Sequence, residues 1–311
     1  MGQDSKMTAE NRNNGQSTLA TSSLSSPVRT MNDAWKPFGY RTYEAECKCE
    51  DCGVKFMGKI GELTLGNSTK KLGGHYCEDC QVKRDFIEEQ QEREAELAQA
   101  AATRRRWRET CGIPYLFMSK DFSTWDKSRV KPAHILAVKY AEEFPVDKST
   151  VGYPSLLMFS KVYGVGKTHL ATAIGHRILD RSRCFEGTNP IMFITETDIM
   201  LRIRGTYDRG YTGDSEQSIF GSLRGKSLLI LDDVGKEQPQ DPKFMQRVYF
   251  NIIDGRYQRR LPMVITSNLD MDEIFDHIGG AAADRIFEMT QGNIVELKAK
   301  ESYRQRSVIE K

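Results

Sequence analysis

Residues 159–170 read FSKVYGVGKTHL, and this stretch decides the fold of the 311-residue chain. It follows an apolar, strand-like run at 155–159 and opens a run of helix formers at 167–181. A glycine-rich turn between a strand and a helix lets successive backbone N–H groups face phosphates, which is the setting of a P-loop. We therefore predict a nucleotide-binding segment made of Tyr163, Gly164, Val165, Gly166, Lys167, Thr168 and His169.

Two side chains of this segment have predicted roles toward a nucleoside triphosphate. Lys167 is expected to reach the β- and γ-phosphates, and the Thr168 hydroxyl is expected to hold Mg²⁺. Lys161 departs from the P-loop pattern because it stands where the first glycine is expected. A side chain at that position could crowd the turn or weaken nucleotide binding. The alternative for the whole segment is an ordinary strand–turn–helix connection.

Strand-like and helix-like stretches alternate through the rest of the chain. Further apolar runs, each short enough for one strand, occupy 191–195, 227–231, 262–266 and 293–297, and helical patterns lie near 197–209, 243–258 and 271–288. Strands separated by helices of this length form a parallel sheet that is covered on both faces. The predicted fold class is therefore α/β, with a parallel five-stranded sheet between helices.

Two acids, Asp232 and Asp233, end the third apolar run. Ligands of open α/β sheets bind at the carboxyl ends of the strands, so we expect these acids at the nucleotide. Asp232 is predicted to contact Mg²⁺, and Asp233 to orient or deprotonate the attacking water. Asn268 ends the next strand and is predicted to help position that water. The alternatives are a solvated strand end for the acids and a helix cap for Asn268.

The segments GKTHLA, LLILDDVGKE, ITSNL and SYRQR together resemble the AAA+ ATPases of the DnaC/DnaI helicase-loader and IstB group, over roughly residues 110–307. The resemblance implies a P-loop AAA+ domain, which we place at 111–311. It implies that Arg285 is an arginine finger completing a neighbouring subunit's site, and that Arg304 is the sensor II arginine of its own subunit. A guanidinium suits both roles, because it stabilises charge on a transferring phosphoryl group. The alternative is that both arginines are surface charges on helices.

The resemblance also implies a function. The resemblance to the helicase loaders implies that the protein loads a replicative helicase onto single-stranded DNA, with ATP binding and slow hydrolysis acting as the switch. An arginine finger that acts in trans implies self-association through the ATPase domain. A close alternative is an IstB-like helper of a transposase. An alternative of another class is an adaptor that binds ATP without hydrolysing it, for which Lys161 is the only hint.

The seven cysteines predict a metal site rather than a disulfide framework, because their number is odd and most of them are clustered. Two CxxC pairs, separated by 24 residues, can complete a tetrahedral site of four thiolates, which selects Zn²⁺. Cys47 or His75 could replace one ligand, and an iron–sulfur cluster is a further alternative. The predicted zinc ligands are Cys49, Cys52, Cys77 and Cys80, which leaves Cys47, Cys111 and Cys184 as expected free thiols.

Three segments are expected before the ATPase domain at 111–311. Residues 1–38 are rich in Ser, Thr, Asn and Gln and are predicted to be a disordered tail. Residues 39–82 form the predicted zinc-binding domain, a small zinc ribbon, and 83–110 a helical linker, because 82–109 contains strong helix formers and no Gly or Pro. The family resemblance implies that the zinc domain binds the replicative helicase. Nucleic-acid binding by the ribbon is the competing interpretation.

The balance of 45 basic and 43 acidic side chains excludes a polybasic protein, so any DNA site must be local. Residues 200–211 interleave arginines with tyrosines, which can follow phosphates and stack on bases of single-stranded DNA. A solvated helix face is the alternative. No apolar run is long enough for a membrane span, so we expect a cytoplasmic protein that does not bind membranes. The DNA-binding candidates are Arg202, Arg204, Tyr207 and Arg209.

Overall fold

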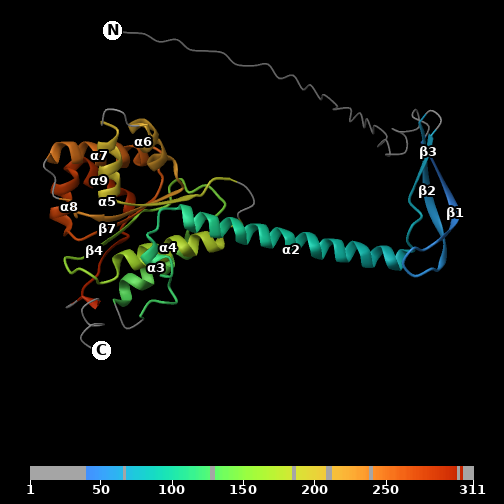
Figure 1. Ribbon diagram of the computed structural model, residues 1–311. Coiled ribbons are helices and arrows are strands. Elements are labelled where there is room, and N and C mark those ends of the chain that lie inside the picture. Colours follow the sequence, from blue (N-terminus) through green and yellow to red (C-terminus); the bar gives the residue numbers. More distant parts are fainter. Residues whose placement is uncertain are drawn as a thin grey trace, which may run out of the picture. The chain divides into compact units, whose positions relative to one another are not determined.

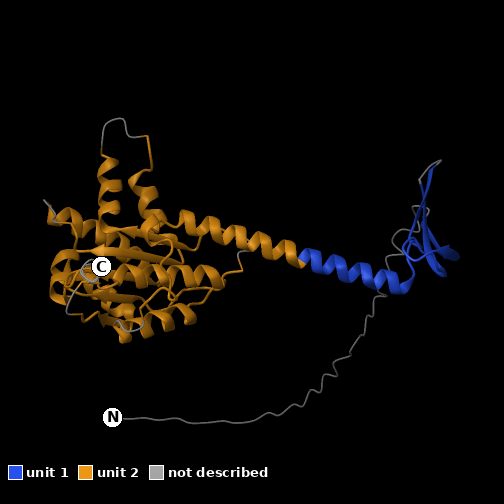
Figure 2. Cartoon of the chain, turned by 60° about the horizontal axis from the view of Figure 1, so that its bottom comes forward, with its two compact units in different colours: residues 1–92 blue, residues 93–311 orange. Residues whose placement is uncertain are grey.

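A computed structural model describes residues 40–65, 68–126, 130–183, 187–207, 212–237, 241–299 and 302–303. The chain divides into two units, residues 1–92 and 93–311 (Figure 2). The predicted disordered tail and Cys184 lie outside the described residues. No described helix is both long enough and apolar enough to cross a membrane.

The described part of the first unit is built on a three-stranded antiparallel sheet, which the sequence analysis did not anticipate. Its strands, in the order β1-β2-β3, are β1 (Tyr40–Lys48), β2 (Lys55–Leu65) and β3 (Ser68–Leu72). The β1–β2 turn contains the first CxxC pair, and the second pair lies where helix α2 begins. Helix α2 (Glu78–Thr110) is the helix predicted over 82–109, and it continues through the boundary between the units.

The second unit contains the predicted five-stranded sheet, in which every pairing is parallel. The strand that precedes the P-loop lies inside the sheet, with a neighbour on each side. In the order β5-β6-β7-β4-β8, the strands are β5 (Ile191–Thr195), β6 (Leu228–Val234), β7 (Met263–Ser267), β4 (Leu156–Phe159) and β8 (Ile294–Glu296).

Helices cover both faces of this sheet (Figure 1), which confirms the predicted fold class. Alternate side chains of β4 point into different hydrophobic clusters: Leu156 and Met158 pack with α3 and α4, and Leu157 packs with α5 to α9. Along the chain these elements are η2 (Tyr115–Phe117), α3 (Lys131–Glu143), α4 (Lys167–Arg181), α5 (Glu196–Gly205), α6 (Glu216–Gly225), α7 (Pro242–Tyr257), α8 (Met271–Ile278) and α9 (Gly280–Thr290).

The prediction of a single helix over 271–288 is wrong, because α8 and α9 are separate helices. The helical conformation is interrupted at Gly279, whose φ of 88° lies in the left-handed region that favours glycine. Helix α5 ends at Gly205, earlier than expected. Helices α3 and α6 were not predicted.

Candidate nucleotide site and cysteine cluster

The predicted P-loop forms the turn between β4 and α4. Gly164 and Gly166 have φ values of 70° and 104°, and a Cβ at Gly166 would lie 2.5 Å from the ring of Trp125. A glycine is therefore required at 166 both for backbone conformation and for space. The buried Lys167 ammonium donates to the carbonyl oxygens of Ser160 (3.1 Å) and Val162 (3.4 Å), so it is held beside the loop.

A cavity of about 450 Å³ lies against this loop. All seven residues of the predicted nucleotide-binding segment line it, and Asp233 and Asn268 join them from the ends of neighbouring strands. Four further lining residues come from segments far apart in the chain, and the sequence motifs did not single them out as site residues. These are Phe117, Lys120, Lys236 and Tyr303.

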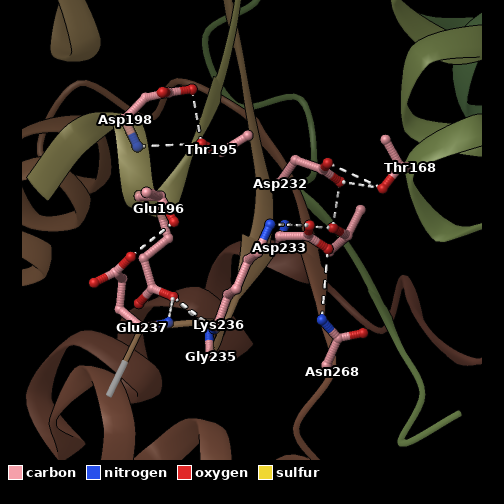
Figure 3. Close-up of polar contacts among 12 residues, drawn as sticks. Thr168, Thr195, Glu196, Asp198, Asp232, Asp233, Gly235, Lys236, Glu237 and Asn268 are labelled. Atoms are coloured by element: carbon pink, nitrogen blue, oxygen red, sulfur yellow. Dashed lines mark hydrogen bonds and ion pairs between the residues drawn. The ribbon is translucent and has the colours of Figure 1, made fainter. Parts of the chain in front are cut away.

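Asp232 lies between two hydroxyl groups at the end of β6 (Figure 3). Its carboxylate oxygens accept hydrogen bonds from Thr168 Oγ1 at 3.0 and 3.1 Å, and one of them also accepts from Thr266 Oγ1 at 2.6 Å. The Asp232 side chain is only 2% exposed, and this burial raises its pKa to about 6. Closely spaced carboxylate and hydroxyl oxygens suit Mg²⁺, so Thr168 and Asp232 fit the ion predicted for them.

Asp233 faces the cavity from a sharply turned backbone, with a φ of 57°. Asn268 Nδ2 lies 3.5 Å from Asp233 Oδ1, and Lys236 Nζ lies 3.6 Å from Asp233 Oδ2 (Figure 3). A non-glycine residue in this left-handed region is uncommon and persists only where its surroundings fix it. The structure therefore brings together the acid and the amide that sequence analysis assigned to the attacking water.

Lys161 turns out not to line the cavity. Its ammonium contacts the start of α8, at 2.6 Å from Asp270 Oδ2 and 3.1 Å from Glu273 Oε1. Its φ is not among the positive values of the described residues, so a side chain fits the turn without backbone strain. The expected crowding of the turn is therefore absent from the geometry.

Of the two arginines that the resemblance implies, the structure describes Arg285. Arg285 lies on α9 and does not line the cavity. Its guanidinium is 3.2 Å from Asp254 Oδ1 and packs over the rings of Phe250 and Tyr257, at 4.6 and 5.6 Å from their centroids. Arg304 lies outside the described residues.

The four predicted zinc ligands lie together in the first unit, with all their sulfur atoms within 4.8 Å of one another. Cys52 Sγ and Cys77 Sγ are 3.6 Å apart. Tetrahedral bonds of about 2.3 Å would place two sulfur atoms about 3.8 Å apart, so the cluster fits Zn²⁺. The backbone N–H of Cys52 contributes most to a lowered pKa of Cys49, about 6, which favours the thiolate that a metal needs.

The alternative donors Cys47 and His75 do not belong to this cluster. The Cys47 thiol contacts the Ala45 carbonyl oxygen at 3.4 Å, and His75 Nδ1 lies 2.7 Å from Glu50 Oε1. Cys111, in the second unit, is buried and donates to the Arg108 carbonyl oxygen at 3.2 Å.

The DNA-binding candidates are only partly described. Arg202 and Arg204 are exposed on α5. The Tyr207 hydroxyl donates to Glu216 Oε2 at 2.7 Å and accepts from Arg247 at 3.3 Å. Arg209 lies outside the described residues.

The parallel sheet, the P-loop and the two acids at the end of β6 define a P-loop ATP-binding protein. Residues 155–310 match the family described as IstB-like ATP binding protein, and the chain belongs to this family. The resemblance predicted from the sequence motifs is thereby confirmed.

Several curated proteins are similar to this chain. Replicative helicase loader DnaC of Escherichia coli K12 is 29% identical over 150 residues, which cover 48% of this chain and 55% of that protein. The DnaC of Buchnera aphidicola subsp. Schizaphis graminum is 27% identical over 197 residues, covering 62% and 73%. The chain thus spans about half the length of the E. coli relative. A crystal structure of the DnaC helicase loader aligns with a TM-score of 0.49 and 20% identity, over 60% of this chain and all of that one.

Proposed function

We propose that this protein hydrolyses ATP and uses the cycle to load a replicative helicase onto single-stranded DNA. The observation that carries the hydrolysis is the position of Asp233 and Asn268 at the same cavity as the P-loop. Helicase loading is supported by the similarity to DnaC, a protein named for that role.

In the proposed reaction, Lys167 and the P-loop amides bind the β- and γ-phosphates. Asp233 accepts a proton from the attacking water, and Asn268 orients that water. Thr168 and Asp232 would hold Mg²⁺, which neutralises negative charge on the phosphates when bound. Arg285 of a second copy would complete the site, and Arg304 would contact the γ-phosphate of its own copy. The active form is accordingly a self-associated one.

The remaining partners follow from the other parts of the chain. The cysteine cluster would bind Zn²⁺ and keep the N-terminal unit folded for contact with the replicative helicase, with nucleic-acid binding as the competing role. The exposed Arg202 and Arg204 of α5, with Tyr207 and Arg209, would contact the phosphates and bases of single-stranded DNA.

The hydrolysis is tested by measuring ATP turnover with and without single-stranded DNA. We expect Lys167→Ala to abolish ATP binding, and Asp233→Asn to lower kcat by about 10²- to 10⁴-fold with little change in binding, because it removes the proton acceptor. Lys131→Ala is the control, since this exposed lysine lies outside the cavity. Full activity of both site variants would contradict the assignment, and a wild-type chain that binds ATP without turnover would favour the adaptor.

The loader is separated from the transposase helper by its partner. The transposase helper is the second candidate, because the family that matches the chain is described as IstB-like. We expect the intact protein to capture the replicative helicase of its host, and the capture to weaken when the cysteine cluster is disrupted. Capture of a transposase and no helicase would overturn the loader proposal.

A further inference from the structure

Glu196 is a buried acid that the reaction proposed above does not use. It is the first residue of α5, and its side chain is 0% exposed. Burying a carboxylate away from water costs free energy unless hydrogen bonds compensate for the lost hydration. In the part of the chain that the structure describes, five donors surround Glu196, and they come from three other segments.

One oxygen of Glu196 binds the loop that follows β6 (Figure 3). Oε2 accepts hydrogen bonds from three consecutive backbone N–H groups, those of Gly235 (2.9 Å), Lys236 (2.8 Å) and Glu237 (3.1 Å). Successive N–H groups that converge in this way form an anion-binding nest, and here the anion is a side chain of the same protein. Gly235 has a φ of 90°, which gives the loop the tight curvature that a nest requires.

The other oxygen of Glu196 binds two helices. Oε1 accepts from the Tyr249 hydroxyl of α7 at 2.8 Å and contacts His277 Nε2 of α8 at 2.5 Å. Burial acts to raise the pKa of Glu196, but the hydrogen bond and charge of His277 and the Glu237 amide together bring it below its ordinary value. The carboxylate is therefore ionised, and it fastens the loop to α5, α7 and α8.

This loop leads directly out of the nucleotide site. Asp233, which faces the cavity, lies near the end of β6, two residues before Gly235. The loop includes Lys236, which also lines the cavity and lies near the Asp233 carboxylate. Thr197, the neighbour of Glu196, adds a second link through a 2.8 Å hydrogen bond to Glu237. The left-handed backbone of Asp233 needs such support from its surroundings.

We propose that Glu196 is a positioning residue for ATP hydrolysis, whose carboxylate holds residues 233–237 in the conformation that aims Asp233 at the attacking water. The inference rests on the proposed hydrolysis. It assigns no contact with the nucleotide to Glu196, because this residue does not line the cavity. The P-loop is formed by a separate segment, so we expect nucleotide binding to change little when the link is lost.

The test compares steady-state ATP hydrolysis by Glu196→Ala, Glu196→Gln and the control Asp198→Asn in the full chain. Asp198 lies on the same first turn of α5 but contacts Thr195 rather than the loop. We expect Glu196→Ala to lower kcat by about 10- to 100-fold with KM for ATP within about threefold, because a small misplacement of a catalytic group is enough to cost this much. Glu196→Gln keeps one carbonyl oxygen for the loop amides and should recover part of the loss.

A second measurement reports on the loop directly. Hydrogen exchange at the amides of residues 235–237 should accelerate in Glu196→Ala and stay at the wild-type rate in Asp198→Asn. If Glu196→Ala does not fold, Tyr249→Phe, which removes one donor but keeps the ring, should show a smaller fall in kcat. Wild-type kcat in the Glu196 variants, a rise in KM alone, or an equal loss in Asp198→Asn would overturn the inference. A wild-type chain without turnover would instead remove the proposed function itself.

Discussion

His176 on α4 illustrates how one residue's surroundings fix its protonation state. Its side chain is 3% exposed, and its Nδ1 lies 3.1 Å from the Lys120 carbonyl oxygen. A carbonyl oxygen can only accept, so Nδ1 carries the hydrogen. Nε2 is buried and has no hydrogen-bond partner among the described residues, so protonation there would bury an uncompensated charge. Burial first, and then the charge of Arg108, lower the pKa of His176 below its ordinary 6.5, against the opposing effects of Lys120, Asp180 and Asp121.

A pH dependence of stability follows from this lowered pKa. Below about pH 6.5 the unfolded chain binds a proton at His176 more readily than the folded chain does. The contribution of His176 to the free energy of unfolding should therefore be largest above that pH. It should decrease as the pH falls from the pKa of His176 in the unfolded chain to its lower pKa in the folded chain. His176→Asn keeps a donor for Lys120 but cannot titrate. Urea unfolding at pH 5 to 7.5 should show a shallower slope for this variant, and an unchanged slope would contradict the assignment.

At the scale of elements, Lys161 joins the P-loop turn to the start of α8. Asp270 caps α8 through a capping box with Glu273, and the Lys161 ammonium binds both of these carboxylates. The capping acids accept hydrogen bonds from N–H groups at the start of the helix, and their negative charge is stabilised by the positive end of the helix dipole. The lysine therefore connects the P-loop to the helix that follows the predicted water-positioning strand.

Replacing Lys161 with the glycine of the usual P-loop pattern should therefore improve neither ATP affinity nor stability. We expect Lys161→Gly to leave the ATP dissociation constant within about threefold of wild type and to lower the free energy of unfolding only slightly, from lost exposed ion pairs and a freer unfolded chain. The ion pairs contribute little because the Lys161 side chain is 59% exposed. Lys161→Arg keeps the charge and is the control. A tenfold gain in ATP affinity in the glycine variant would show that the lysine crowds the site.

At the scale of the whole molecule, the two units depend on different sources of stability. The second unit has two hydrophobic clusters on the faces of its sheet. In the described part of the first unit, β1 and β3 are mostly exposed, and the buried cysteines Cys49 and Cys80 belong to the metal-binding cluster. Such a small unit needs a metal or similar cross-link to fold.

Removal of the metal should therefore act on one unit and spare the other. We expect a chelator, or Cys77→Ser, to release one Zn²⁺ per chain and to unfold the N-terminal unit, as seen by circular dichroism. ATP turnover by the second unit should stay within about twofold. Cys47→Ser is the matched control, because Cys47 lies outside the cluster, and it should retain its zinc. A wild-type chain purified without bound zinc would contradict the assignment, as would equal zinc loss in both variants.

The sequence by itself determined those parts of the protein that depend on neighbours along the chain. The P-loop, the acids at the end of β6 and the four clustered cysteines are predictable because each is a short pattern of local geometry or ligand spacing. The parallel five-stranded sheet is predictable because strand-like and helix-like stretches alternate along the chain. Whether Arg285 and Arg304 act as implied remains a prediction.

Only the tertiary structure decided which distant residues meet. Phe117 and Tyr303 come to the P-loop from opposite ends of the second unit, and Gly279 separates two helices where the sequence pattern indicated one. Glu196 carries no motif, yet it binds a loop 39 to 41 positions away. Contacts of this kind depend on how β5 and β6 pair and how α7 and α8 pack against them, and no local rule of spacing or propensity specifies that packing.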